Sequence, residues 1–271
     1  MGIQCRVRNQ EELAVETRRL TAPEIFSAAV ENAREELRRS ARSLAFSGLA
    51  GGLAMGLTGL GVASVRAILG SGTWEELASF AVYPIGFIAV IIGRAQLFTE
   101  NTLYPVVLVL DEHKCRRDNL VKTLRLWAVV FGANVTGAFL FALLAIKSGA
   151  LSADIAAQLV TLGNLSSTGS GAHFFWSGVV GGWLIALVAW MVTASQWTIG
   201  QVVMIWLLAF VVGVGKFSHC IASSGEILAA VVSGSASLAG YFHWLLFATS
   251  GNVLGGVVIV SLLNYGQVRG N

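Results

Sequence analysis

Hydrophobic and charged residues are unevenly distributed along this chain. Asp, Glu, Lys and Arg are absent from six stretches, residues 43–65, 77–93, 101–110, 126–146, 155–215 and 227–268. Because a helix needs about 20 apolar residues to cross a bilayer, several stretches are long enough for one crossing and the two longest almost for two. Small polar segments at 161–172 and 233–241 predict the loops that divide those two. The pattern predicts an all-α, polytopic membrane protein.

Two of the predicted crossings are interrupted by ionisable residues. The second and third charge-free stretches flank Arg94 and Glu100, and a similar pair of apolar segments flanks Lys216 and His219. Counting each interrupted segment once gives six transmembrane helices. The second and the fifth of these helices are predicted to be broken.

Composition and charge agree with a membrane location. Of all residues, 55% are hydrophobic and only 12% are charged, which is about half the charge of a typical soluble protein. Fourteen of the 18 Lys and Arg residues fall before the first crossing, between the second and third, or at the C-terminal end. Only Arg66 and Lys147 fall on the other side. The positive-inside rule therefore predicts that both termini are cytoplasmic.

The six crossings form one predicted domain, 43–268, between a cytoplasmic N-terminal segment, 1–42, and a cytoplasmic tail, 269–271. Thr21 and Glu24 form a capping-box pattern, and apolar and charged residues then alternate at helical spacing. We expect an amphipathic helix along the cytoplasmic face of the membrane. No cleavable signal is apparent, and nothing favours binding to nucleic acid. The expected location is the cytoplasmic (inner) membrane of a prokaryote, with the lipid bilayer as a partner.

Three landmarks recur in the same order in the two halves of the chain. Each half holds three predicted crossings, and because this number is odd, the second half enters the membrane from the opposite side. The sequence therefore predicts two inverted three-helix repeats, an architecture that places the permeation path at the midplane between broken helices. The matching pairs, at offsets of 130, 122 and 118 residues, are Ser47-Gly-Leu-Ala-Gly-Gly52 with Ser177-Gly-Val-Val-Gly-Gly182, Gly93-Arg94 with Gly215-Lys216, and Asn134-Val-Thr-Gly137 with Asn252-Val-Leu-Gly255.

Small residues recur at intervals of four in the first and fourth crossings. Residues at this spacing share one face of a helix, where small side chains let neighbouring helices approach closely. We therefore expect these positions to serve packing rather than contact with a solute. They are Gly48, Gly52 and Gly56, and Gly178, Gly182 and Ala186.

Ionisable groups inside a crossing are candidates for a role in transport, because each costs about 2.5–3.5 kcal/mol to insert. One interpretation is that Arg94 pairs with Glu100, or Lys216 with Glu226, and that these pairs only neutralise charge at the breaks. The other is that Arg94 and Lys216, at equivalent places in the two halves, attract an anion toward the centre. Histidine titrates near neutral pH in water, so His219 is a candidate for exchanging a proton with a weak acid.

Several common chemistries find no support in the sequence. It contains no Walker loop, no dinucleotide-binding glycine motif, no catalytic triad grouping and no paired metal-ligand motif. The three cysteines, Cys5, Cys115 and Cys220, are scattered. We expect no enzymatic activity, no catalytic residues, no metal site and no cofactor.

The motifs together resemble those of the formate/nitrite transporter family over about residues 25–265. The resemblance implies an aquaporin-like six-helix bundle that assembles as a homopentamer, with one pore in each protomer. The run Phe98-Thr-Glu-Asn-Thr102 is similar to a poorly characterised branch of that family. The motifs are Tyr83-Pro-Ile-Gly86-Phe87 and Leu97-Phe98-Thr99 in the second crossing, Trp127 to Gly137 in the third, Gly182-Trp183-Leu184 to Trp190 in the fourth, Phe217-Ser-His219-Cys-Ile-Ala222 in the fifth, and Gly251-Asn252-Val-Leu-Gly255-Gly256 in the sixth.

The resemblance also implies roles for individual residues. Thr99 and His219 would meet in a hydrogen bond at the pore centre, with Asn252 beside them. Leu97, Phe98 and Ile185 would form an outer apolar constriction, and Phe87 and Val212 an inner one. Members of the family move small monovalent anions such as formate, nitrite and hydrosulfide, with the histidine as a candidate proton donor.

Three departures from the family pattern bear on the substrate. Lys216-Phe-Ser-His219 stands where the family usually has Gly-Phe-Glu-His, Gly182 stands where an asparagine is usual, and Val212 is smaller than the usual aromatic residue. The working hypothesis is a channel or proton symporter for small monovalent anions of weak acids, with proton coupling at His219. Two alternatives remain open. They are an aquaporin-like channel for neutral solutes, although Asn-Pro-Ala boxes are missing, and a non-conducting membrane scaffold or sensor.

Overall fold

The structure, a computed structural model, describes residues 18–70 and 72–270. The first 17 residues of the predicted cytoplasmic segment, including Cys5, lie outside the described residues. All regular secondary structure in the described ranges is helical. The elements are α2 (Ala22–Arg38), α3 (Ala41–Leu69), α4 (Thr73–Phe80), α5 (Ile85–Ile92), η1 (Glu100–Thr102), α6 (Tyr104–Asp111), η2 (His113–Cys115), α7 (Arg116–Lys147), α8 (Ala153–Ser166), α9 (Gly171–Ala194), α10 (Thr198–Val214), α11 (Ala222–Ser233), α12 (Leu238–Leu254), η3 (Gly255–Leu262) and α13 (Leu263–Arg269).

Helix length separates the candidate membrane spans into two groups. α10 and α11 are apolar but have only 17 and 12 residues. At about 1.5 Å per residue, each is shorter than the roughly 30 Å hydrocarbon core of a bilayer. The fifth predicted crossing therefore consists of two helices that are each too short to span alone. Five segments are long and apolar enough by themselves, namely Ala41–Leu69, Thr73–Ile92, His113–Lys147, Gly171–Ala194 and Leu238–Arg269.

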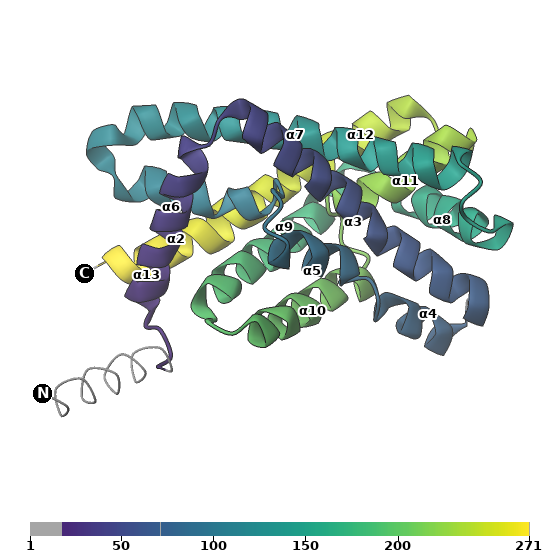
Figure 1. The fold of residues 1–271 in the computed structure, drawn as a ribbon, viewed down its shortest axis with the longest axis horizontal. Helices are drawn as coiled ribbons and strands as arrows, with labels where there is room; N and C mark the ends of the chain where they lie inside the picture. Colours follow the sequence, from purple (N-terminus) through teal and green to yellow (C-terminus); the bar gives the residue numbers. More distant parts are fainter. Residues whose placement is uncertain (1–17, 71, 271) are drawn as a thin grey trace, which may run out of the picture.

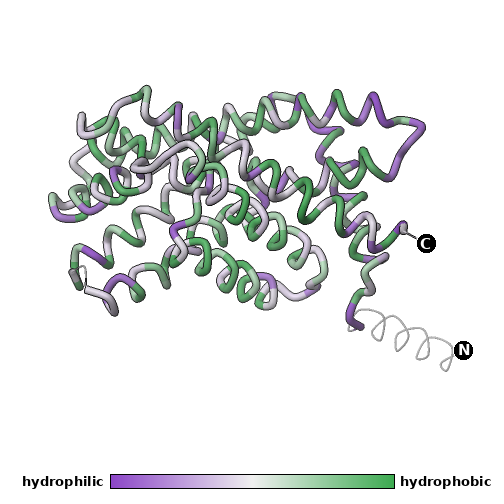
Figure 2. Tube along the Cα trace, turned by 180° about the vertical axis from the view of Figure 1, so that it is seen from behind, coloured by the Kyte–Doolittle hydropathy of each residue, from purple (hydrophilic) through white to green (hydrophobic). Residues whose placement is uncertain are grey.

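The long helices α3, α7, α9 and α12 run roughly along the long axis of the molecule, and α2 crosses it steeply at one end (Figure 1). α2, α6 and α13 gather at one end, close to both termini, and α4 and α8 lie at the opposite end. We call these the α2 end and the α4 end. Figure 2 shows apolar residues through the middle of the bundle and a concentration of hydrophilic residues near the α2 end. This distribution is the one expected when the middle of a bundle faces lipid.

Glycines allow two helix pairs, α3 with α7 and α9 with α12, to pack at very short range. A Cβ atom at Gly52 would lie 2.0 Å from the backbone oxygen of Asn134, and one at Gly182 would lie 2.3 Å from that of Asn252. No larger side chain fits at these distances. The packing role predicted for the glycine stripes is confirmed.

α5 and α10 end in the same way. Arg94 after α5 and Lys216 after α10 adopt left-handed conformations, with φ of 56° and 51°. The backbone hydrogen bonds form a Schellman motif at both ends, which turns the chain sharply out of the helix. A basic side chain at this position also complements the negative end of the helix dipole. The bonds run from Arg94 N to Ile91 O (3.2 Å), Ala95 N to Val90 O (3.0 Å), Lys216 N to Gly213 O (3.0 Å) and Phe217 N to Val212 O (3.0 Å).

The side chain of Asn134 on α7 holds the first break in place. Its Nδ2 donates to the carbonyl oxygens of Gly48 (2.7 Å) and Gln96 (2.9 Å), and its Oδ1 accepts from the amide of Phe98 (2.9 Å). The bonds to Gln96 and Phe98 satisfy buried backbone groups of the break after α5, and the bond to Gly48 attaches Asn134 to α3. Asn134 therefore links α3, α7 and the break.

Asn252 on α12 does the same for the second break. Its Nδ2 donates to the carbonyl oxygens of Gly178 (2.7 Å) and Ser218 (2.9 Å), and its Oδ1 accepts from the amide of Cys220 (2.8 Å). Each partner is the counterpart of a partner of Asn134, at the offsets found in the sequence. The predicted internal repeat thus extends to individual hydrogen bonds.

The N-terminal helix α2 docks on the rest of the protein. Its apolar face is buried against α6, α9 and α13, whereas the sequence analysis placed the helix along the membrane surface. Arg34 pairs with Glu112 at 2.8 Å, and hydrogen bonds from Asn119 and from this guanidinium lower the pKa of Glu112. Hydrogen bonds from Thr21, reinforced by Arg18, lower the pKa of Glu24 to about 2, so the capping box stays charged at neutral pH.

Two local features differ from the expectations. Residues 161–166 belong to α8, although the small polar residues there had predicted a loop. The helix is favoured because α8 packs against α3 and α11, with Leu159, Leu162 and Gly163 buried. The last crossing contains an eight-residue π-helical segment, η3, which no sequence pattern indicated.

Candidate functional site

Thr99 and His219 meet in the interior of the bundle. Thr99 Oγ1 lies 2.8 Å from His219 Nε2, and both residues are fully buried. The backbone amide of Ala222 donates to His219 Nδ1 at 3.0 Å. Because an amide can only donate, Nδ1 of the neutral ring carries no hydrogen, and Nε2 is the donor to Thr99. The contact implied by the family resemblance is present, and its donor is assigned.

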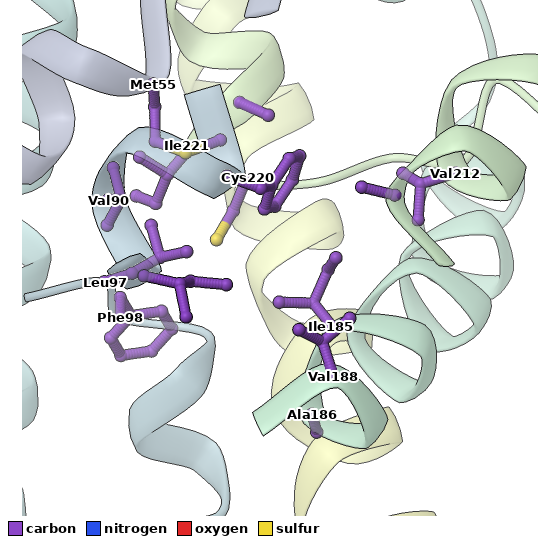
Figure 3. Close-up of a cluster of buried hydrophobic side chains, with 14 of the residues drawn as sticks. Met55, Val90, Leu97, Phe98, Ile185, Ala186, Val188, Val212, Cys220 and Ile221 are labelled. Atoms are coloured by element: carbon purple, nitrogen blue, oxygen red, sulfur yellow. The ribbon is translucent and has the colours of Figure 1, made fainter. Parts of the chain in front are cut away.

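Apolar side chains surround this pair. Phe87 packs edge-on against the imidazole, with ring centroids 5.0 Å apart. Leu97, Ile185 and Val212 are also fully buried, and Figure 3 shows Leu97 and Ile185 extending toward each other from opposite sides. A solute that passes here would lose its hydration shell. Whether these residues act as constrictions of a pore stays a prediction.

Phe98 takes a different direction from Leu97. Its ring packs against Trp127 and Phe131 of α7, with centroids 5.8 and 4.9 Å away. The ring of Phe98 therefore anchors the break to α7. Its part in an outer constriction with Leu97 and Ile185 stays a prediction.

Two cavities lie at opposite ends of the bundle. A cavity of about 100 Å³ at the α2 end is lined by Leu97 together with Glu35 of α2. A cavity of about 180 Å³ at the α4 end is lined by Val212 and Arg66. The sequence analysis placed Leu97 at the outer constriction and the α2 segment in the cytoplasm, but the two share one cavity. The two predictions therefore disagree: with cytoplasmic termini, Leu97 lies at the inner side of the path and Val212 at the outer side.

The ion pairs differ from those considered in the sequence analysis. Lys216 Nζ pairs with Glu76 at 2.9 Å, not with Glu226. The same Glu76 oxygen accepts from Arg66 at 3.0 Å. Within residues 18–70 and 72–270, Arg94 forms no ion pair, with Glu100 or otherwise. Neutralisation at the breaks therefore explains Lys216 but not Arg94.

Charge is distributed unequally between the two cavities. The α2-end cavity contains Arg94 but also three carboxylates, from Glu35, Glu36 and Glu100. The α4-end cavity contains two cations, from Arg66 and Lys216, and the single carboxylate of Glu226. The surroundings of Arg94 therefore do not favour anions, whereas the α4 end carries the more positive lining.

Asn252 does not offer its side chain to a solute, because backbone carbonyls occupy both hydrogens of its amide. Asn252 therefore braces the second break beside the central pair, and no hydrogen of its side-chain amide is left for a solute. Asn134, Arg66 and Glu76 are functional candidates that the sequence analysis did not assign. The equivalence of Asn134 and Asn252 in the repeat was the one sequence signal that could have revealed the bracing role of Asn134.

The arrangement is that of a membrane channel or transporter, with a buried polar pair enclosed by apolar side chains between two charged cavities. In the described residues no group of three or more potential metal ligands occurs. The sequence model of the family described as Formate/nitrite transporter matches residues 23–266. The chain belongs to this family, which consists of transporters and channels rather than enzymes.

Named relatives and solved structures agree with this assignment. The chain is 30% identical to the Inner membrane protein YfdC of Escherichia coli K12, with 88% of this chain and 76% of that protein covered. It is 29% identical to the Probable formate transporter of Methanothermobacter thermautotrophicus, with 69% and 73% covered. A structure titled FNT family ion channel has a TM-score of 0.78 at 23% identity, covering 90% of this chain and 98% of that one. A second, titled Pentameric formate channel with formate bound, has 0.69 at 17%, covering 85% and 98%.

Proposed function

We propose that this protein conducts small monovalent anions of weak acids, such as formate, nitrite or hydrosulfide, across the membrane. The solute passes between the two cavities and meets the Thr99–His219 pair at the centre of the path. The observation that carries the proposal is this buried hydrogen bond of 2.8 Å, enclosed by Phe87, Leu97 and Ile185. Membership of the formate/nitrite transporter family supports the same class of solute.

The hydrogen-bond assignment gives the central pair a specific use. His219 Nε2 donates to Thr99 Oγ1, so the hydroxyl hydrogen of Thr99 is free to donate to another acceptor. Apolar rings strip water from a solute, and a donor between them replaces one lost hydrogen bond. A hydrogen-bond donor at this place favours a solute with an acceptor oxygen, such as formate or nitrite, over a cation.

Proton coupling at His219 stays a prediction, and the geometry sets its condition. A second ring proton would have to enter at Nδ1, where the amide of Ala222 already donates. Protonation of the ring therefore requires this backbone hydrogen bond to break. In the proposal His219 acts first as a hydrogen-bond donor that orients Thr99.

We further propose six crossings in two inverted repeats, with both termini in the cytoplasm and the protein in the inner membrane. The matched bonds of Asn134 and Asn252 support the repeat, and a similar protein is named for the inner membrane. Assembly as a homopentamer is proposed from the similar fold of a pentameric channel. Exposed apolar side chains on α7 and α12, such as Leu144 and Leu246, would then face lipid or a neighbouring subunit.

The test is flux into proteoliposomes of formate, nitrite, hydrosulfide and glycerol. His219→Leu introduces the residue type found at the equivalent position of the first break, Leu97. His243→Leu is the matched control, because His243 is exposed at the α4 end of α12. We expect anion flux in the parent protein and in His243→Leu, and a decrease of about tenfold in His219→Leu, since losing one buried hydrogen bond costs on the order of 1.4 kcal/mol.

Glycerol flux without anion flux would replace the proposal with a neutral-solute channel. Absence of flux for all four solutes would favour the scaffold or sensor. The closed apolar surroundings of His219 are compatible with a scaffold, but a scaffold does not explain why Arg94 lines a cavity without forming an ion pair in the described ranges.

A further inference from the structure

Glu226 is a buried carboxylate that the central pair does not use. It lies on the first turns of α11, and only 8% of the residue is exposed. Ser166 Oγ of α8 donates to its Oε1 at 2.6 Å. In the part of the chain that the structure describes, no Lys, Arg or His approaches it within 4.0 Å. The Glu226 carboxylate is therefore buried without a direct ion pair.

Two glycines build the site around this carboxylate. A Cβ at Gly163 of α8 would lie 2.1 Å from the backbone oxygen of Glu226, and a Cβ at Gly59 of α3 would lie 3.4 Å from its Oε2. Both helices can therefore pack tightly against α11 at this position, and Ser166, one turn beyond Gly163, is held at the carboxylate. The side chain nevertheless lines the α4-end cavity. Glu226 is thus fixed in the wall and remains in contact with the cavity.

The net charge at this cavity depends on whether Glu226 is ionised. Glu76 bridges Arg66 and Lys216, so these three groups together carry one positive charge. An ionised Glu226 cancels this positive charge, whereas a protonated Glu226 leaves the cavity with a net positive charge. The titratable residues that line the cavity together with Glu226 are Arg66 of α3, Tyr83, His173 of α9 and Lys216. Glu76 of α4 joins them through its pairs with Arg66 and Lys216. α7 and α12 present Phe141 and Tyr241 to α11.

We propose that Glu226 is the residue that delivers a proton to the anion in the α4-end cavity. An anion is attracted when Glu226 carries its proton, because the cavity is then positive. The O–H bond of the Glu226 carboxylic acid breaks and an O–H bond forms on the anion, so the neutral acid leaves and Glu226 remains as the carboxylate. A hydronium ion of the medium on that side returns a proton to Glu226 and becomes water. The cycle moves one proton with each anion.

This position suits the transfer better than the central histidine. Phe87, Val212 and Tyr83 separate the cavity from the Thr99–His219 pair, and an ion pays for dehydration at such an apolar barrier while a neutral acid does not. Protonation at Glu226 occurs before that barrier. His219 lies beyond it and lines neither of the two cavities.

The inference rests on the proposed anion transport and is tested by formate–formate exchange in proteoliposomes. Labelled formate is followed with the same pH on both sides, from about pH 4.5 to about pH 6.5, after subtraction of protein-free vesicles. The variants are Glu226→Gln, which is always neutral, and Glu226→Asp, which can still carry a proton. Glu75→Gln is the control, since Glu75 lies beside Glu76 on α4 but does not line the cavity.

We expect Glu226→Gln to match the parent protein at the lowest pH, where formic acid is supplied by the medium. Its rate should then decrease about tenfold per pH unit, as the fraction of formic acid does, and fall well behind the parent. Glu226→Asp and Glu75→Gln should keep the parent's shallower profile.

Two results would overturn the inference and leave anion transport intact. One is a Glu226→Gln profile parallel to that of the parent. The other is a loss that is equal at every pH, which indicates a structural role. A parent protein that exchanges no formate at any pH would instead contradict the proposed function itself.

Discussion

The two breaks, residues 93–99 and 215–221, share a scaffold but differ in chemistry. Both have a basic residue at positive φ in their second position and are held by an asparagine from a neighbouring helix. The equivalent of Leu97 is His219, however, and the equivalent of Thr99 is Ile221 at the offset of 122 residues. The central hydrogen bond therefore joins two positions that are not equivalent in the repeat, Thr99 of the first break and His219 of the second.

This difference separates what stabilises the fold from what carries out its function. Groups that satisfy the backbone at a break recur in both halves, because any unwound segment in a membrane has the same unpaired amides and carbonyls. Thr99 and His219 each occur in one half only, because their equivalents are Ile221 and Leu97. We therefore expect substitutions of the repeated residues to affect stability similarly in both halves, and substitutions of the unique residues to affect flux.

The largest effect is expected from Asn134→Ala and Asn252→Ala. Each removes three hydrogen bonds, and a buried group left unpaired costs about 1–3 kcal/mol, although interhelical bonds in membrane proteins average nearer about 0.6 kcal/mol. We expect each variant to lose at least about 2 kcal/mol, seen as a lower unfolding temperature in detergent. Asn164→Ala, which removes a surface contact with Ser235, is the control. Strong destabilisation by only one of the two would show that the scaffold is not shared.

Gly52→Ala and Gly182→Ala test the close approach of the helix pairs. The added methyl group would meet a backbone oxygen at 2.0 and 2.3 Å, respectively, and overpacking of this kind typically costs about 1–3 kcal/mol. Gly132→Ala in α7 meets nothing within 4 Å, so it should be neutral or slightly stabilising. Unfolding temperatures of the three variants check this, and a Gly52→Ala protein as stable as Gly132→Ala would disprove the tight packing.

The smallest effect concerns the two left-handed residues. Arg94→Gly and Lys216→Gly both relieve a positive φ, which is worth about 1 kcal/mol. Lys216 also loses its pair with Glu76, in which Lys216 is 64% exposed, and such pairs contribute about 0–1 kcal/mol. We expect Arg94→Gly to be stabilised more than Lys216→Gly in chemical unfolding. The opposite order would mean that the lysine pair contributes more than its exposure suggests.

The sequence predicts the breaks well because their causes are local. Charged residues at 94 and 216 interrupt apolar stretches, and two asparagines recur at nearly the same spacing, so both could be found without a structure. The Thr99–His219 contact followed from the family resemblance. All of these depend on residue type and position along the chain.

Features that depend on tertiary packing were not predictable in this way. No pattern indicates that Lys216 pairs with Glu76 rather than with Glu226, which is nearer in the sequence. Nor does any pattern indicate that backbone carbonyls accept both hydrogens of the Asn252 amide. The predicted sides of Leu97 and Val212 conflict with the predicted cytoplasmic termini, because assigning the sides requires knowing which cavity α2 reaches. α8 was missed because burial between neighbouring helices outweighs the weak propensity of its small residues.

The most direct test of the central pair is formate flux through Thr99→Val and Thr99→Ser. Valine keeps the shape of threonine but removes the hydroxyl group that accepts from His219, whereas serine keeps the hydroxyl. We predict that flux falls about tenfold in Thr99→Val, which corresponds to about 1.4 kcal/mol for one buried hydrogen bond, and stays within about twofold of the parent in Thr99→Ser. Equal flux in the valine and serine variants, both correctly folded, would contradict the account.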